Sequence, residues 1–110
     1  MPNRSQPQYL YLTTTGRRSG ARREIEIWFT RRGRRYYVIA EYPTSHWVQN
    51  LRAIPQVAVR VGKRRFSATA RMIDPLAEPE LHAAVRQLSR DKYGWGDGLI
   101  VELKPEAPHH

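Results

Sequence analysis

Apolar and polar residues alternate along much of the chain, and this period of two predicts a protein made of short strands. In the range Arg23–Thr30 the apolar residues Ile25, Ile27 and Phe29 share one face, which indicates a strand with a single buried face. The next run, Arg35–Ala40, is apolar or aromatic from its second residue onward and is typical of a central strand buried on both faces.

Two turns join neighbouring strands into hairpins. The cationic segment Arg31–Arg34, which contains a glycine, links the two strands just described. A second hairpin turns at Gly62-Lys63, between alternating valines in the range 57–61 and an alternating strand over 66–72. We expect Tyr9–Thr14 and Leu99–Leu103 to supply the outer strands.

Two segments lack this alternation and are predicted as helices. Ser45–Ala53 begins with a residue suited to N-capping and ends two residues before a proline. In Pro79–Lys92 the apolar residues Leu81, Val85 and Leu88 form one stripe, as in a helix that packs by one face. About six short strands, one short helix and one longer helix predict a mostly β fold, a small antiparallel barrel that the helices plug or flank.

The length of 110 residues suits one compact domain, which we place at residues 9–104, and its modest core favours a homodimer. We expect residues 1–8 to form a flexible N-terminus and residues 105–110 a disordered tail. No stretch is apolar enough for a transmembrane segment or a secretory signal, so we expect a cytoplasmic protein. The chain has no cysteine, and its histidines and carboxylates lack the spacing of metal ligands, so no metal is expected.

The charge of the chain narrows the choice of partner. The formal net charge is +9, from 19 lysines and arginines against 10 acidic residues, and most of the cations are arginine. Arginine is suited to bidentate contact with phosphate and carboxylate groups. An anionic partner is therefore favoured, either a nucleic acid or a small polyanionic cofactor.

The segment Gly16–Arg23 concentrates this charge in one turn. Two glycines bracket Arg17, Arg18 and Ser19, and further arginines follow directly. Glycines permit positive φ angles that let successive backbone N–H groups point into one concavity, and guanidinium groups add forked donors. The segment predicts an anion-binding loop for a phosphorylated or acidic ligand, with an ordinary solvated turn as the alternative.

Several separated motifs resemble those of one family in their order and spacing. These are Leu12–Gly20 with the later Arg23, the strand Tyr37–Ala40, and the segment His46–Pro55. They resemble the deazaflavin-dependent nitroreductase family, whose split β-barrel is related to the FMN-binding, pyridoxamine-phosphate-oxidase-like flavoproteins. The resemblance covers the chain from about Leu10 to Leu103. It implies a reductase that uses coenzyme F420, a deazaflavin hydride carrier with an anionic tail.

The resemblance also implies which residues bind the cofactor. They are Arg17, Arg18 and Ser19 in the phosphate turn, with Arg22 and Arg23 after it; Glu24, Ile25, Glu26, Ile27 and Trp28 beside the ring; Ile39, Ala40, Glu41 and Tyr42 at its polar edge; and His46, Trp47 and Asn50 on the helix that closes over it. Tyr93 and Trp95 are candidates for the substrate pocket. The segment Glu41–Thr44 departs from the family, because a short acidic stretch replaces a glycine-rich loop. No dedicated catalytic residue is expected, since the cofactor carries the chemistry.

The leading hypothesis is an F420H2-dependent oxidoreductase of the nitroreductase or quinone-reductase type. It would transfer hydride from the reduced deazaflavin to a small electrophilic acceptor, a quinone, an enone or a nitro compound, with no specific nucleic-acid partner. Three alternatives stay open: an FMN-binding split-barrel protein, a basic nucleic-acid-binding β-barrel, and a family member that stores a ligand or serves as a structural dimer.

Overall fold

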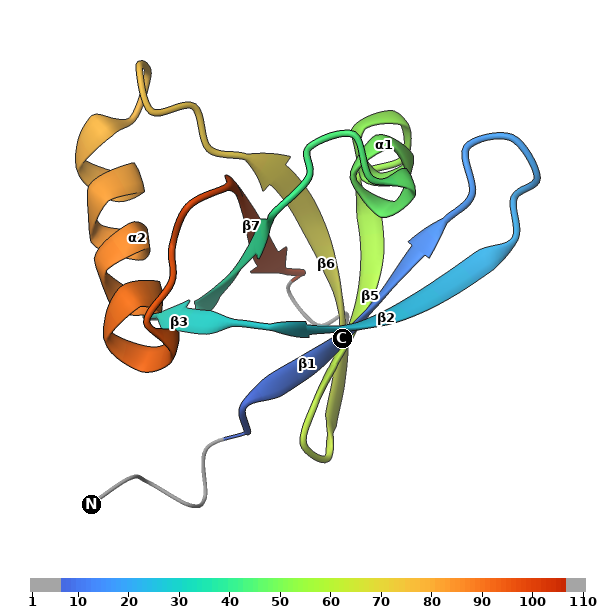
Figure 1. The fold of residues 1–110 in the computed structure, drawn as a ribbon. Helices are drawn as coiled ribbons and strands as arrows, with labels where there is room; N and C mark the ends of the chain where they lie inside the picture. The colour runs from blue at the N-terminus through green and yellow to red at the C-terminus, as the bar shows by residue number, and fades with distance from the viewer. Residues whose placement is uncertain (1–6, 107–110) are drawn as a thin grey trace.

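The computed structural model describes residues 7–106 and shows one curled antiparallel sheet with two helices (Figure 1). In chain order the elements are β1 (Tyr9–Thr15), β2 (Arg22–Trp28), β3 (Thr30–Arg32), β4 (Arg35–Ala40), α1 (His46–Ala53), β5 (Gln56–Val61), β6 (Arg64–Met72), α2 (Pro79–Tyr93) and β7 (Leu99–Pro105). The strand order across the sheet is β2-β1-β5-β6-β7-β4-β3. The mostly β, split-barrel fold expected from the sequence is confirmed, as are both hairpins.

The strands at the edges of the sheet are not those expected. Strand β1 lies between β2 and β5, and β7 lies between β6 and β4, so the prediction that they are outer strands is wrong. The edge strands are β2 and β3. The alternation predicts a single strand over Arg23–Thr30, but in the structure this strand ends at Trp28 and β3 begins at Thr30. Charged side chains cover both edge strands, which opposes pairing with another chain. The break also explains why seven strands form where about six were expected.

Two apolar clusters hold the fold together. The larger cluster fills the barrel and contains Leu10, Leu12, Val38, Val59 and Leu103, among others. The smaller cluster lies on the opposite face of β4 and β7, where α2 packs. Its buried members are Tyr37, Ile39, Ile73, Val85 and Ile100. Strand β4 is buried on both faces, as predicted, because its alternate side chains belong to different clusters.

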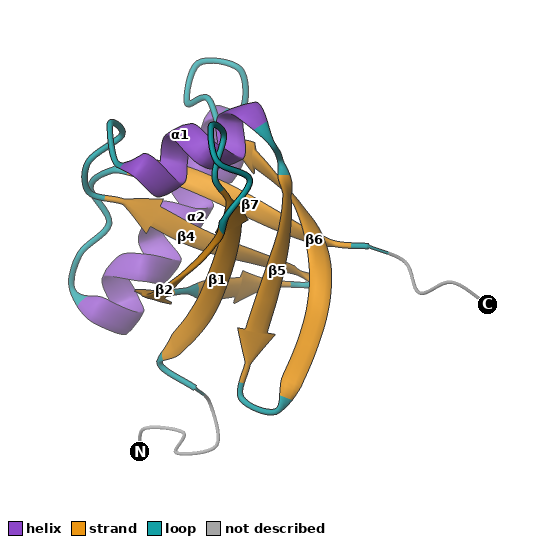
Figure 2. Cartoon of the chain, turned by 90° about the vertical axis from the view of Figure 1, so that its right-hand side faces the viewer, coloured by secondary structure: helices purple, strands orange, loops and turns teal. Residues whose placement is uncertain are grey.

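The helices occupy different parts of the barrel. Helix α1 lies across one end, next to the β1–β2 loop, while α2 lies against the side (Figures 1 and 2). Ser45 directly precedes α1, but its hydroxyl donates to the carbonyl of Tyr42 at 2.7 Å and makes no capping hydrogen bond. In α2, Val85 is buried and Leu81 packs against the smaller cluster, as the predicted stripe requires. No helix among residues 7–106 is long and apolar enough to cross a membrane.

The last strand continues beyond the expected start of the tail. Pro105 pairs with Ala68 at the end of β7, and the Glu106 N–H donates to the carbonyl of Ser67 at 2.9 Å. A disordered tail beginning at Pro105 is therefore wrong for these two residues. The rest of the expected tail, 107–110, and most of the expected flexible N-terminus, 1–6, lie outside the described residues.

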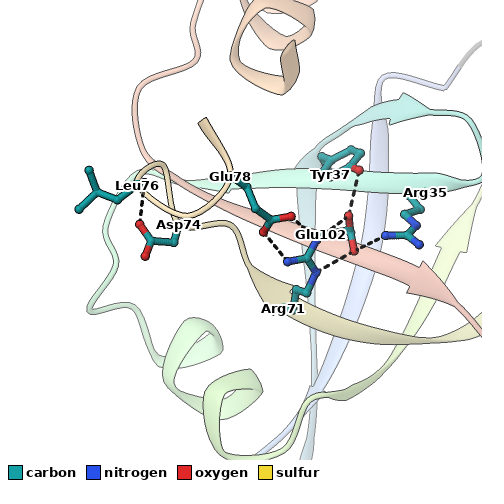
Figure 3. A network of polar contacts seen from close by, with 7 residues as sticks. All are labelled: Arg35, Tyr37, Arg71, Asp74, Leu76, Glu78 and Glu102. Carbon is teal, nitrogen blue, oxygen red and sulfur yellow. Dashed lines mark hydrogen bonds and ion pairs between the residues drawn. The ribbon is translucent and has the colours of Figure 1, made fainter. Parts of the chain in front are cut away.

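A buried carboxylate joins the strands beneath α2 (Figure 3). Glu102 on β7 is only 2% exposed and accepts hydrogen bonds from Arg35 at 3.1 Å, Tyr37 at 3.0 Å and Arg71 at 3.1 Å. Arg71 also pairs with Glu78, the residue that precedes α2, at 2.5 Å. Burial by itself would raise the pKa of Glu102, but the hydrogen bonds from Arg71, Tyr37 and Arg35 outweigh it and hold the pKa below its ordinary value. The network thus ties three strands to the start of α2.

We predict that Glu102→Gln lowers the free energy of unfolding by about 1 to 3 kcal/mol, because the negative charge between the arginines is lost and one of the two acceptor oxygens becomes an NH2 donor that cannot accept from Tyr37 and Arg71. A carboxyl whose folded pKa is lowered stabilises fully above its ordinary pKa, 4.5 for this residue, and loses that contribution as the pH falls through the lower folded value. The difference between the two proteins should therefore shrink below that pH. Urea unfolding at several pH values measures it, with the exposed Glu106→Gln as control. An equal effect of the two substitutions would contradict the role of the network.

Candidate functional site

A cavity of about 620 Å³ opens where the curled sheet is split, beside the end of β2 and the end of β4. Strands β2 and β4 contact each other there but do not pair. Ten predicted site residues line the cavity: Glu26, Ile27, Trp28, Ile39, Ala40, Glu41, Tyr42, Trp47, Tyr93 and Trp95. All three segments assigned to the ring by resemblance therefore contribute to one space, together with the end of α2 and the residues after it, which supply Tyr93 and Trp95.

Six further lining residues were not predicted: Tyr9, Phe29, Thr30, Tyr37, Ser45 and Ser89. Phe29 and Thr30 reach the cavity because the chain breaks between β2 and β3, and alternation gives no sign of that break. Ser89 faces inward from α2, where its hydroxyl donates to the carbonyl of Trp95 at 2.6 Å. In the sequence, a serine four residues after Val85, on the apolar stripe of the helix, is the one signal that could have pointed to Ser89.

The arginine loop is closed on itself by its own backbone. The Gly16 N–H donates to the carbonyl of Ala21 at 2.7 Å, and the Gly20 N–H donates to the carbonyl of Gly16 at 2.9 Å. The Ala21 N–H donates to the Ser19 hydroxyl at 3.1 Å, and of the two glycines only Gly20 has a positive φ, 71°. The N–H groups of Gly16, Arg17, Gly20 and Ala21 are thus bonded within the protein, and an anion-binding role for the loop backbone stays a prediction. An anion at this loop would be held by guanidinium groups.

Asn50 connects the loop to α1. Its Oδ1 accepts from the Arg17 backbone N–H at 3.2 Å and from the Arg17 guanidinium at 2.7 Å. Trp47, one turn earlier on the same helix, lines the cavity and packs against the barrel core. Residues three apart lie on the same face of a helix, so this face of α1 spans from the cavity to the arginine loop. Asn50 is 5% exposed, and the two hydrogen bonds that its side-chain oxygen accepts tie the loop to α1; its assignment to the cofactor stays a prediction.

The cations of the loop have no acidic partner. Among the residues that the structure describes, no carboxylate lies within 4.0 Å of Arg17, Arg18, Arg22 or Arg23. Arg23 shares a face of β2 with Ile25, toward the barrel interior, whereas Arg22 lies on the outer face and borders a groove with Tyr11 and Arg60. The loop therefore presents uncompensated positive charge to more than one side.

Besides the loop residues and Asn50, three predicted residues lie away from the cavity. Glu24 is exposed on the outer face of β2, 4.0 Å from Arg60. Ile25 packs against the barrel core, and His46 is exposed at the first position of α1. Their assignment to the cofactor stays a prediction.

Two carboxylates, by contrast, do line the cavity. Glu26 accepts a hydrogen bond from the Tyr11 hydroxyl at 2.6 Å, and Glu41 is exposed at the rim. Neither has a cationic group within 4.0 Å in the described part of the chain. An acidic group would therefore be repelled here, and the cavity favours the uncharged part of a ligand.

Tyr93 forms the wall between β2 and α2. Its ring stacks on Trp28 with centroids 4.6 Å apart and planes 2° from parallel. Its hydroxyl accepts from the Phe29 N–H at 3.0 Å and lies 2.5 Å from the Phe29 carbonyl and 2.7 Å from that of Gln8. Burial raises the pKa of this hydroxyl above its ordinary value, so it stays protonated. Tyr93 lines the pocket as predicted, but its hydroxyl is committed to the backbone at the strand break.

We predict that Tyr93→Phe destabilises the protein by about 1 to 3 kcal/mol, because the buried Phe29 N–H loses its hydrogen-bond acceptor. Chemical denaturation gives the change in the free energy of unfolding. Tyr42→Phe is the matched control, since it removes a hydroxyl from a residue that lines the same cavity but is 64% exposed. Equal stability of the two variants would show that the Tyr93 hydroxyl does not hold the break.

The curled sheet, open between β2 and β4 and flanked by two helices, defines a split β-barrel protein. The family model described as F420H(2)-dependent quinone reductase matches residues 3–96 of the sequence. The chain belongs to the F420H(2)-dependent quinone reductase family.

Similar proteins agree with this assignment. An F420H(2)-dependent quinone reductase of Mycobacterium tuberculosis is 36% identical over 73 residues, which are 63% of this chain and 49% of that protein. The chain thus spans about half the length of the curated relatives it matches. Among solved structures, an F420-H2 dependent reductase, FDR-A, superposes with a TM-score of 0.74 at 21% identity, over 88% of this chain and 94% of that one. The haem storage protein HutZ of Vibrio cholerae superposes with a TM-score of 0.76 at 21% identity, over 96% and 86%. These two likenesses establish the fold.

Proposed function

We propose that the protein is an F420H2-dependent reductase that passes hydride to a small, uncharged electrophilic acceptor. The observation that carries this proposal is the pairing of two features on one face of α1. An aromatic cavity lies beside Trp47, and a cationic loop without acidic partners is tied to Asn50. A flat ring with a long anionic tail matches this pair of environments.

The residues present fit such a cofactor by charge and by shape. Arg17, Arg18 and Arg23 would hold the acidic tail through guanidinium contacts, and Trp47 would cover the ring. Bound F420H2 would supply the hydride. The end of β4 is fixed close to Gly98, where any side chain would collide with the Ala40 carbonyl, so the backbone of Ile39–Glu41 offers a rigid edge to the ring. The chain's contribution is to position the reactants and exclude water.

The class of acceptor follows from the carboxylates. Glu26 and Glu41 line the cavity without cationic partners among residues 7–106, so they disfavour an acceptor that carries its own negative charge. Quinones, enones and nitro compounds are uncharged electrophiles, and the aromatic walls suit their flat shape. The quinone name of the matched family supports the first of these.

We predict that Arg18→Gln and Arg23→Gln each weaken F420 binding by about tenfold or more, because a charge-assisted contact contributes about 1.5 to 3 kcal/mol. Titration of the cofactor against the purified protein, followed by fluorescence or calorimetry, measures the affinity. Arg34→Gln in the distant β3–β4 turn is the control of equal charge and should bind as the unchanged protein does.

The same titration separates the alternatives. Tight FMN binding without affinity for F420 would replace the proposed cofactor. Salt-sensitive binding of single-stranded nucleic acid that scales with strand length, with neither cofactor bound, would favour a nucleic-acid-binding barrel. Bound F420 without turnover of any quinone, enone or nitro compound would leave a binding protein in place of an enzyme.

We also propose a homodimer with a cytoplasmic location. The rim of the cavity exposes three aromatic side chains, Tyr9 at 40%, Trp28 at 38% and Tyr42 at 64%, and a second copy that covers them would close the cavity to water. Sedimentation analysis should show a dimer at micromolar concentration. Tyr42→Glu should shift it toward monomer while Glu106→Gln does not. A monomer at all concentrations would contradict this arrangement.

A further inference from the structure

A second cavity of about 620 Å³ lies at the other end of the barrel from α1. It is bordered by the β5–β6 turn, the break between β2 and β3, the last turns of α2, and Pro7, whose carbonyl accepts from Lys92 at 3.4 Å. Figures 1 and 2 show this turn and α1 at opposite ends of the sheet. The two cavities share only Phe29 and Thr30, so this space is separate from the arginine loop and from Trp47.

The floor of this second cavity is apolar. Phe29, Tyr36 and Val61 are buried residues of the barrel core, and Leu88 adds a half-buried side chain from α2. The rings of Phe29 and Tyr36 pack against each other with centroids 5.8 Å apart. A ligand that reaches this floor must bring an apolar body, because it meets mostly carbon.

The rim is cationic and lacks counter-ions. Arg31, Lys63, Arg64 and Lys92 border the cavity, against the single carboxylate of Asp91. Over the range 7–106, none of these four cations has a carboxylate within 4.0 Å. The Asp91 carboxylate itself accepts from the Gln87 side-chain amide at 2.8 Å. Positive charge over a low-dielectric floor attracts an anion more strongly than the same charge in open solvent.

The charged groups lie against the aromatic floor. The Lys92 ammonium lies 4.1 Å from the Phe29 ring centroid and donates to the Phe29 carbonyl at 3.0 Å. The Arg31 guanidinium lies 5.2 Å from the Tyr36 ring centroid, and Arg64 donates to the Tyr36 hydroxyl at 3.4 Å. The surroundings of the Lys92 ammonium lower its pKa, through partial desolvation. Apolar surface and cations are thus in direct contact, so one ligand can engage both.

We propose that this cavity binds a single-chain amphipathic anion, with an acidic head at Lys63, Arg64 and Lys92 and an apolar body over Phe29, Tyr36 and Leu88. The volume lies within the range of about 300 to 1,000 Å³ that is usual for small-molecule sites. The site is distinct from the one assigned to F420 and does not depend on the proposed reductase activity.

Calorimetry with the full chain, free of cofactor, tests this proposal with decanoate below its micelle concentration as the probe. Decanoate should bind saturably. Decylammonium, which keeps the chain and reverses the charge, and acetate, which keeps the head and lacks the chain, should each bind at least about tenfold more weakly.

Variants then locate the site. Lys63→Gln combined with Arg64→Gln should weaken decanoate binding about tenfold or more, because two charge-assisted contacts are lost. Arg65→Gln is the matched control, since Arg65 is the next residue and lies on the outer face of β6 opposite Arg60, away from the cavity. It should change the affinity less than about twofold. Leu88→Gln, which leaves every charge in place, should weaken binding through the floor, and thermal unfolding confirms that each variant is folded.

Four outcomes would overturn the proposal. Equal binding of decylammonium would show a purely apolar site, and an equal loss in Arg65→Gln would show nonspecific charge attraction. Binding to phosphatidylglycerol vesicles but neither to decanoate nor to phosphatidylcholine vesicles would assign the cations to an anionic membrane surface. Decanoate binding that appears only after removal of residues 1–6 would assign the cavity to this chain's own N-terminal segment.

Discussion

Two side chains from the last turn of α2 hold the backbone of Phe29, and this contact fixes where the sheet splits. Tyr93 accepts from the Phe29 N–H, and both Tyr93 and Lys92 reach the Phe29 carbonyl. Phe29 lies between two strands, so its backbone N–H and carbonyl are not paired in the sheet. Without the partners on α2, each of these buried groups would cost free energy comparable to a lost hydrogen bond. The break is therefore stable only while α2 is docked, and both cavities take their shape from it.

Docking of α2 in turn relies on a sheet face that is apolar at one end and ionic at the other. Ile39 and Ile100 supply the apolar part and pack in one cluster with Val85 of α2, and Glu102 with its arginines supplies the ionic part. The apolar part carries most of the energy, because burial of large side chains gains about 1.5 to 3 kcal/mol each. The ionic part fixes the position of the start of the helix. Arg71 bridges the buried Glu102 to Glu78, and so sets where the helix begins relative to the strands.

The sequence predicts those parts of the fold that depend on local periodicity. The pattern of apolar residues located every strand except β3 within a few residues, and the glycines at 33 and 62 marked both hairpin turns. Alternation says nothing about the order of strands in a curled sheet, which explains why β1 and β7 were placed at its edges. The alternation also predicts that Phe29 is one more inward residue of a continuous strand. In the structure, the backbone at Phe29 carries the chain from β2 at one edge of the sheet to β3 at the other.

The candidate site was only partly accessible from sequence for a related reason. Composition and residue type pointed to the arginines, and the family resemblance pointed to Trp47. The network around Glu102 was missed because its partners lie 31 to 67 residues away along the chain and only the pairing of β4, β7 and β6 brings them together. In the arginine loop, the hydrogen bonds from Gly16, Gly20 and Ala21 close the turn on itself, a feature that the pattern of glycines did not indicate.

The shared wall of the two cavities has a mechanical consequence. Phe29 and Thr30 line both cavities. The carbonyl of the peptide between them, that of Phe29, accepts hydrogen bonds from Lys92 and Tyr93 of α2. A ligand on either side that moved Lys92 or Tyr93 would alter the same carbonyl contact, and occupancy of one cavity would then change the free energy of binding in the other. Such coupling would be reciprocal by thermodynamic necessity, whatever the ligands are. The strand break is thus the element that both cavities share and through which coupling between them would pass.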